Sequence, residues 1–140
     1  MRIDSFLSLK SGKVKKTVQR PEGVAAADVS CPGVQQLKLR MYHLDGNLPD
    51  RRADYGCRVY WGILPTGDAA PEQTAHKRHY LQRPPSSGEE LPRSRFTRRK
   101  KDTFGFMPED SGYTAWFCIR YENRNGESGP WGPMFSAVIP

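Results

Sequence analysis

The fold is decided by the stretch from Lys101 to Pro140, KDTFGFMPEDSGYTAWFCIRYENRNGESGPWGPMFSAVIP. Its pattern is strand, turn, strand, Gly-rich turn, strand. In the middle strand one parity carries the larger apolar side chains, at Ala115, Phe117, Ile119 and Tyr121. The other parity carries Trp116, Cys118, Arg120 and Glu122. Successive side chains of a strand point to opposite faces, so this pattern predicts one face in the core and one wetter face.

A chain reversal follows this strand. The run 123–127, NRNGE, is rich in residues that tolerate positive φ, which predicts a turn. Beyond Pro130 and Pro133, the residues from Met134 to Ile139 form a short apolar run of strand length. The stretch therefore predicts a hairpin.

Two segments upstream show the same two-residue period. Residues 57–63, CRVYWGI, are rich in β-forming residues, and one of their faces carries Val59, Trp61 and Ile63. Residues 34–44 alternate apolar and basic side chains, with the apolar ones at Leu37, Leu39 and Met41. No stretch longer than a turn has the 3.6-residue period of a helix.

Together these patterns predict an all-β fold of antiparallel strands in two sheets. Short alternating strands bury their apolar faces only against a second sheet. At 140 residues the chain has the size of one domain, and its 13 Gly and 12 Pro are typical of a loop-rich β protein. We expect the shared core to contain Val59, Trp61, Phe117, Ile119 and Tyr121.

The tripeptide Tyr121-Glu122-Asn123 and the residues 126–131, GESGPW, resemble the corresponding passage of fibronectin type III domains. The resemblance covers roughly residues 32–140. It implies a fibronectin type III/immunoglobulin-like antiparallel β-sandwich over residues 34–140. It also implies a scaffold that is used mainly for binding.

At a finer level the chain is similar to a group of uncharacterised bacterial proteins of gut anaerobes. These proteins share a C-terminal signature, E-N-x-x-G-E-x-G-P-W…S-A-I/V-I-P. In this chain the signature stands as Glu122-Asn123, Gly126-Glu127, Gly129-Pro130-Trp131 and residues 136–140, SAVIP. The resemblance to this group implies no particular activity.

The composition of residues 1–33 predicts a basic N-terminal arm or linker ahead of the sandwich. They contain several Lys and Arg, and the run from Val24 to Val29 is short and Ala-rich. Residues 1–16 lack the pattern of a secretory signal, so export is not expected and the cytoplasm is slightly favoured. No apolar run is long enough to cross a bilayer, so we expect no membrane insertion.

The chain has three cysteines, Cys31, Cys57 and Cys118, so at least one thiol is free unless a second chain supplies its partner. Cys57 falls on the inward parity of its strand and Cys118 on the outward parity. A disulfide between these two residues is therefore not expected. We expect all three to be structural thiols, because a buried free Cys packs as a small hydrophobe.

His76 and His79 form the only pair whose spacing hints at a metal site. A structural zinc site needs four ligands and a catalytic one needs three, but no second pair stands near, and Lys77 and Arg78 repel a cation. The sequence also lacks a phosphate-binding Gly-rich loop, a nucleophile elbow and carboxylates spaced for acid–base chemistry. We therefore expect no enzymatic activity, no metal and no cofactor.

Positive charge is concentrated in one segment. The net charge is +7, and residues 76–101 hold nine Lys and Arg against two Glu, so the remaining chain is balanced. The candidate polyanion-binding residues are Arg93, Arg95, Arg98, Arg99, Lys100 and Lys101. If this segment is extended, the residues that share a parity and line one exposed face are Arg93, Arg95, Arg99 and Lys101. Such a face attracts polyanions.

Two plainer interpretations of the basic segment stay open. Basic side chains on an exposed sheet edge discourage pairing with strands of other molecules. Alternatively, the segment is a loop whose charge keeps the protein in solution.

The sequence names no ligand, and two classes of function remain. The first is a non-catalytic protein-interaction or assembly module, in which a sandwich edge or its end loops meet a partner protein. The second is a binder of nucleic acid or anionic glycan through residues 93–101. Salt separates them, because only the second is expected to fail steeply as ionic strength rises. A protein is the expected partner, and the oligomeric state stays open.

Overall fold

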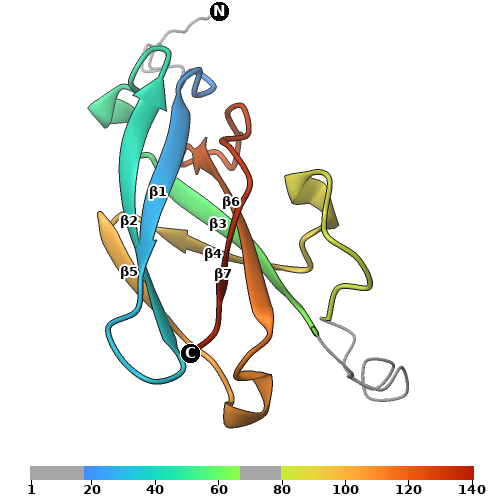
Figure 1. Ribbon diagram of the computed structural model, residues 1–140. Helices are drawn as coiled ribbons and strands as arrows, with labels where there is room; N and C mark the ends of the chain where they lie inside the picture. Colours follow the sequence, from blue (N-terminus) through green and yellow to red (C-terminus); the bar gives the residue numbers. More distant parts are fainter. Residues whose placement is uncertain (1–17, 67–79) are drawn as a thin grey trace, which may run out of the picture.

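The computed structural model describes residues 18–66 and 80–140, and they form two antiparallel sheets (Figure 1). Sheet A has the strand order β1 (Val24–Ser30), β2 (Gln36–Asp45), β5 (Lys101–Gly105). Sheet B has the order β4 (Arg93–Thr97), β3 (Gly56–Leu64), β6 (Thr114–Glu122), β7 (Phe135–Val138). Within these residues, three single-turn 3-10 helices lie between strands: η2 (Arg51–Ala53), η3 (Gly88–Glu90) and η4 (Pro108–Asp110). The predicted all-β class with two antiparallel sheets is confirmed.

The core lies between the two sheets and follows the predicted parities. Sheet A contributes Leu37, Leu39, Met41 and Phe104, and sheet B contributes Val59, Ile63, Phe117, Ile119 and Tyr121, all of them buried. Trp61 differs from the prediction, since it is only partly buried. It pairs with Arg93 of the edge strand β4, so its ring fills the open side of the sandwich, edge-on to Phe104 and Phe106.

The sandwich begins earlier than the sequence indicates. Residues 24–30 fall in the expected arm or linker, yet they form β1 and pair with β2 along their whole length. Three successive Ala residues hide this strand, because Ala is a weak β-former and gives no apolar alternation. Backbone pairing with β2 and burial of Ala25 in the core hold the strand in place. Residues 1–17 lie outside the described residues.

Part of the outer face of sheet B is covered by other segments of the chain. Cys118 is only 2% exposed and forms a second apolar cluster with Leu81 and Leu91. The prediction of a wetter face is therefore wrong at Cys118. Alternation says which face a residue occupies, but it does not say that the segments around Leu81 and Trp131 fold over that face.

The buried side chain of Asn123 holds the turn after β6 together through hydrogen bonds. The side chain is 2% exposed, and its amide nitrogen donates to the backbone oxygen of Gln19 at 3.0 Å and to a carboxylate oxygen of Glu127 at 2.9 Å. Its amide oxygen accepts from the backbone N–H groups of Asn125 and Glu127, each at 3.0 Å. Gly126 takes the positive φ of 81° that closes the turn. One buried amide thus ties the turn to the segment that enters β1.

Cys57 and Cys118 lie on opposite faces of sheet B. Cys57 is opposite Tyr121 and packs against the core, whereas Cys118 is opposite Tyr60 in the outer cluster. All three thiols, including the exposed Cys31, are free. Burial raises the pKa of Cys57 to about 11 and also raises the pKa of Cys118. Both thiols therefore stay protonated and weakly nucleophilic at neutral pH.

Candidate binding surfaces

The six basic residues that the sequence singles out do not form one surface. They run along β4, which is an edge of sheet B, through a turn, and into β5, which is an edge of sheet A. The chain therefore changes sheets in the middle of the segment. The predicted exposed face through Arg93, Arg95, Arg99 and Lys101 is wrong, because the segment is not one continuous strand.

Arg93 and Arg95 turn toward the gap between the sheets. They are opposite Trp61 and Val59, whose side chains point inward, so their own side chains take the inner face. The guanidinium carbon of Arg93 lies 5.1 Å from the centre of the Trp61 ring. Arg95 donates to a carboxylate oxygen of Asp102 in sheet A at 3.0 Å. Inward-pointing charges of this kind are a known way of protecting a sheet edge.

The other four residues lie on the turn and on β5. Arg98 forms an ion pair with Asp54 at 3.0 Å. Arg99, Lys100 and Lys101 are exposed and form no ion pair within residues 18–66 and 80–140. The backbone oxygen of Lys100 accepts from the N–H of Met41 at 2.7 Å, which holds the turn against β2.

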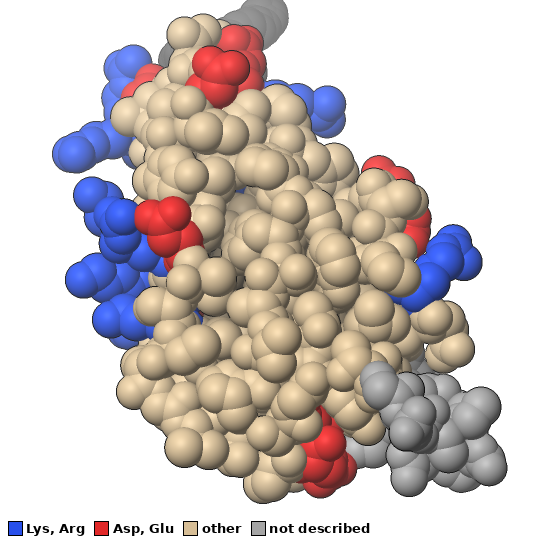
Figure 2. All heavy atoms as spheres, viewed as in Figure 1, with Lys and Arg blue, Asp and Glu red and all other residues tan. Residues whose placement is uncertain are grey.

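Structure adds three residues of β2 to this basic region. Lys38, Arg40 and Tyr42 alternate with the buried Leu39 and Met41, so they lie on the outer face of sheet A. Lys and Arg gather on this flank of the molecule, beside β2 and β5 (Figure 2). The alternation in residues 34–44 already contained this signal, but only the pairing of β2 with β5 brings its basic residues next to residues 99–101.

The sandwich has two open sides, one formed by the edge strands β4 and β5 and the other by the edge strands β1 and β7. The side formed by β1 and β7 is nearly free of charge. We call it the β1/β7 side. Figure 2 views the molecule from this side, and the surface over β1 and β7 is largely uncharged. No residue of β7 is charged, and Val138 is 59% exposed.

The backbone of β7 alternates between bonded and open groups. Ile139, directly after β7, donates its N–H to Tyr113 and accepts from the N–H of Gly112, each at 2.8 Å, so its polar backbone groups face the β6 side. Backbone groups alternate in direction along a strand, so those of Ala137 also face β6 and those of Ser136 and Val138 face away from it. Strand β7 therefore presents unpaired donors and acceptors along an uncharged edge.

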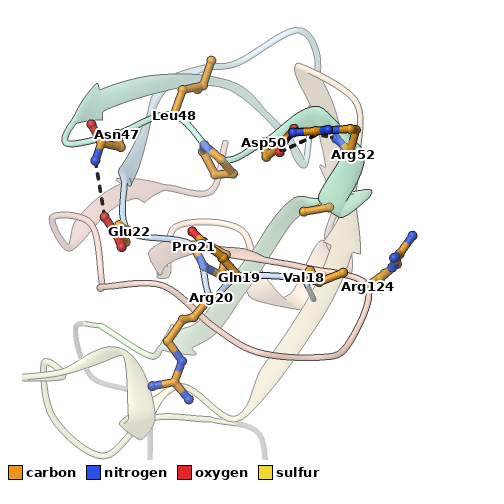
Figure 3. A pocket seen from close by; sticks show the side chains of 12 residues that line it. Val18, Gln19, Arg20, Pro21, Glu22, Asn47, Leu48, Asp50, Arg52 and Arg124 are labelled. Carbon is orange, nitrogen blue, oxygen red and sulfur yellow. Dashed lines mark hydrogen bonds and ion pairs between the residues drawn. The ribbon is translucent and has the colours of Figure 1, made fainter. Parts of the chain in front are cut away.

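A hollow of about 720 Å³ lies where residues 18–22 face residues 47–53 (Figure 3). Its charges are mixed: Arg52 is paired with Asp50 at 3.0 Å, and Glu22 accepts from Asn47 at 3.3 Å. Arg20 points away from the hollow. Among the described residues that line it there is no Ser, Thr, Cys or His, so this lining holds no hydroxyl or thiol nucleophile paired with an imidazole base.

His43 is held in a structural role. Its Nε2 lies 2.8 Å from the carbonyl oxygen of Gly46, and its Nδ1 lies 2.9 Å from the hydroxyl of Tyr121. The carbonyl can only accept, so Nε2 carries the proton and Nδ1 accepts from the tyrosine. The predicted loop histidines, His76 and His79, lie outside the described residues.

In the part of the chain that the structure describes, no three His, Cys, Asp or Glu side chains gather as ligands for a metal ion. That part also contains no helix with the length and apolar character needed to span a membrane. In comparisons with protein-family models and with curated proteins, nothing matches this chain.

Proposed function

We propose that this chain is a non-catalytic protein-interaction module of the fibronectin type III kind, and that an extended segment of a partner protein adds a strand to the open edge of β7. The observation that carries the proposal is the outward direction of the backbone groups of Ser136 and Val138 on an edge without charged residues. Strand addition uses such groups for affinity and the neighbouring side chains for specificity.

The contrast between the two sides of the sandwich supports this choice of edge. On one side Arg93 and Arg95 turn inward and Lys101 lies at the start of β5, which discourages pairing with another strand. On the β1/β7 side no residue of β7 is charged. Charged residues are depleted in the centres of protein interfaces, so the uncharged side is the better docking surface.

The strand order supports the fibronectin type III kind of sandwich. The first, second and fifth strands form one sheet, and the third, sixth and seventh form the core of the other. In this arrangement the fourth strand pairs with the third rather than with the fifth, as in fibronectin type III domains. Such domains serve mainly as binding scaffolds, which agrees with the raised pKa values of Cys57 and Cys118 and with the absence of Ser, Thr, Cys and His from the described lining of the hollow.

Affinity capture from an extract of the native organism tests the proposal with two variants at one position. Ser136→Pro removes the outward N–H, and we expect the fold to tolerate it because that N–H takes no part in the ladder with β6. Ser136→Ala removes only the hydroxyl and keeps the N–H. We expect the wild type and Ser136→Ala to capture the same protein at about 0.15 M and 0.5 M salt, and Ser136→Pro to lose it.

Circular dichroism and urea unfolding show whether Ser136→Pro keeps the fold. Equal capture by a folded Ser136→Pro would contradict strand addition at β7. Capture that disappears at the higher salt concentration in the wild type would favour an electrostatic partner instead.

A further inference from the structure

The outer face of sheet A combines unpaired positive charge with an exposed aromatic ring. Its row on β2 holds Lys38, Arg40 and Tyr42, and Tyr42 is 40% exposed. Lys101 of β5 lies directly opposite Arg40, and Thr103 lies opposite Lys38. The face is therefore neither a covered core surface nor a simple solvated edge.

Two of these cations are placed where they repel each other. Like charges directly opposite on neighbouring strands destabilise a sheet, and Arg40 and Lys101 stand in this relation. Asp28 of β1 offsets part of the repulsion through an exposed ion pair with Arg40 at 2.7 Å. Within the described residues no acid pairs with Lys38 or Lys101.

The turn after β4 adds two cations to the same surface. The hydrogen bond from Met41 to the backbone oxygen of Lys100 keeps the turn beside β2. It brings the exposed Arg99 and Lys100, which form no ion pair with any described residue, next to Lys101. The surface then carries five cations against one carboxylate: Lys38, Arg40, Arg99, Lys100 and Lys101, with Asp28.

We propose that this face binds single-stranded nucleic acid, with phosphates along the five cations and a base stacked on Tyr42. Charge complementarity selects a polyanion. The exposed ring of Tyr42 beside Arg40 favours a polyanion with flat bases. Proteins that bind single strands combine cationic contacts to phosphates with stacking of bases on aromatic side chains. A sulfated glycan has no aromatic base to stack, so it gains less from the ring.

Fluorescence anisotropy with a labelled oligothymidylate of about 12 nucleotides tests this proposal, using the full chain. The first variant combines Lys38→Gln, Lys100→Gln and Lys101→Gln. Its matched control combines Arg20→Gln, Arg51→Gln and Arg124→Gln, which removes the same charge from exposed residues elsewhere. A third variant, Tyr42→Leu, removes the ring and keeps every charge.

We expect the wild type to bind with a log–log salt slope of about −3.5, at about −0.7 for each of five phosphate contacts. The lysine triple variant weakens binding at least tenfold and flattens the slope by about 2, while the arginine control changes it less than threefold. Tyr42→Leu weakens binding about tenfold and leaves the slope unchanged.

Three outcomes would overturn the proposal. The first is no binding by the wild type at about 50 mM salt. The second is an equal loss in the arginine control, which would mean attraction by net charge alone. The third is tighter binding of heparin than of the oligonucleotide together with no effect of Tyr42→Leu, which would identify a sulfated glycan as the occupant.

Discussion

The guanidinium carbon of Arg95 lies 4.0 Å from the centre of the Phe104 ring. Arg95 belongs to sheet B and Phe104 to sheet A, so this contact closes the gap between the two sheets on the β4/β5 side. The ion pair of Arg95 with Asp102, also in sheet A, lies beside it. A residue expected to reach a ligand thus acts as a bridge within the sandwich.

Replacing Arg95 is expected to cost stability, whereas replacing Arg99 is not. Arg95→Gln leaves the mostly buried carboxylate of Asp102 without its cation, and we expect a loss of about 1–2 kcal/mol, reduced by the partial exposure of Arg95. Arg99→Gln is expected to change stability by less than about 0.5 kcal/mol. Urea unfolding measures both values. Equal effects of the two substitutions would show that Arg95 makes no bridge.

Gly88 is expected to be intolerant of a larger residue because it lies against the ring of Trp131. A Cβ added at Gly88 would overlap ring atoms of Trp131. Overpacking of this kind costs about 1–3 kcal/mol, which is our expectation for Gly88→Ala. Gly105→Ala is the control, since nothing lies within 4 Å of the added atom. A Gly88→Ala protein as stable as the Gly105→Ala protein would mean that the segment does not cover sheet B.

Asn123 is expected to be the most sensitive polar residue of the turn. Asn123→Ala leaves two backbone N–H groups and the Gln19 oxygen without their partner and should lower the free energy of unfolding by about 2–4 kcal/mol. Asn123→Asp should not rescue it, because a carboxylate cannot donate to Glu127 and repels it. Asn125→Ala, at an exposed position, should cost less than about 0.5 kcal/mol. Thermal and urea unfolding of the three variants would refute this if Asn125→Ala were the most damaging.

The stability of the protein is expected to fall in mild alkali through Cys57. Burial raises the pKa of this thiol to about 11 in the folded chain, above its ordinary value of 9.0. Between these values the unfolded chain gives up its proton first, so stability is complete below about pH 9 and is lost as the pH rises toward 11. We expect a loss of about 1–2 kcal/mol between pH 8 and pH 10.5 that is absent in Cys57→Ala.

The measurement is urea unfolding of both proteins at the two pH values. Burial also raises the pKa of Tyr121, and Cys57 adds to that shift, so the difference between the two proteins reports the thiol together with its coupling to Tyr121. A wild type and a Cys57→Ala variant with the same pH dependence would contradict a partly buried, neutral Cys57.

The sequence was sufficient for the parts of the fold that alternation controls. The parities of Phe117 and Leu39 place both side chains in the core, because a strand with one apolar face has one way to bury it. Strand β1 could not be predicted in this way, because its three Ala residues show no alternation of apolar and polar side chains. The burial of Cys118 could not be predicted either, because the segments that cover its face come from elsewhere in the chain.

The candidate surfaces were less predictable than the fold. Positive charge in residues 93–101 was visible in the sequence, but whether a given Arg is free depends on its cross-strand partner. Arg95 is paired with Asp102 across the gap between the sheets, whereas Lys101 has no acidic partner in the described part of the chain and lies opposite Arg40. Such pairings join residues far apart in the chain, and a single sequence does not reveal their register.

Site-resolved amide hydrogen exchange tests the central claim, that β7 is an open edge which a partner protein occupies. In the protein alone, the N–H groups of Ser136 and Val138 should exchange quickly, while that of Ala137, bonded to β6, should exchange slowly. In the complex with the captured partner, Ser136 and Val138 should become slow, and β4 should not change. Slow exchange at Ser136 and Val138 in the protein alone, or new protection along β4 and none along β7, would contradict the account.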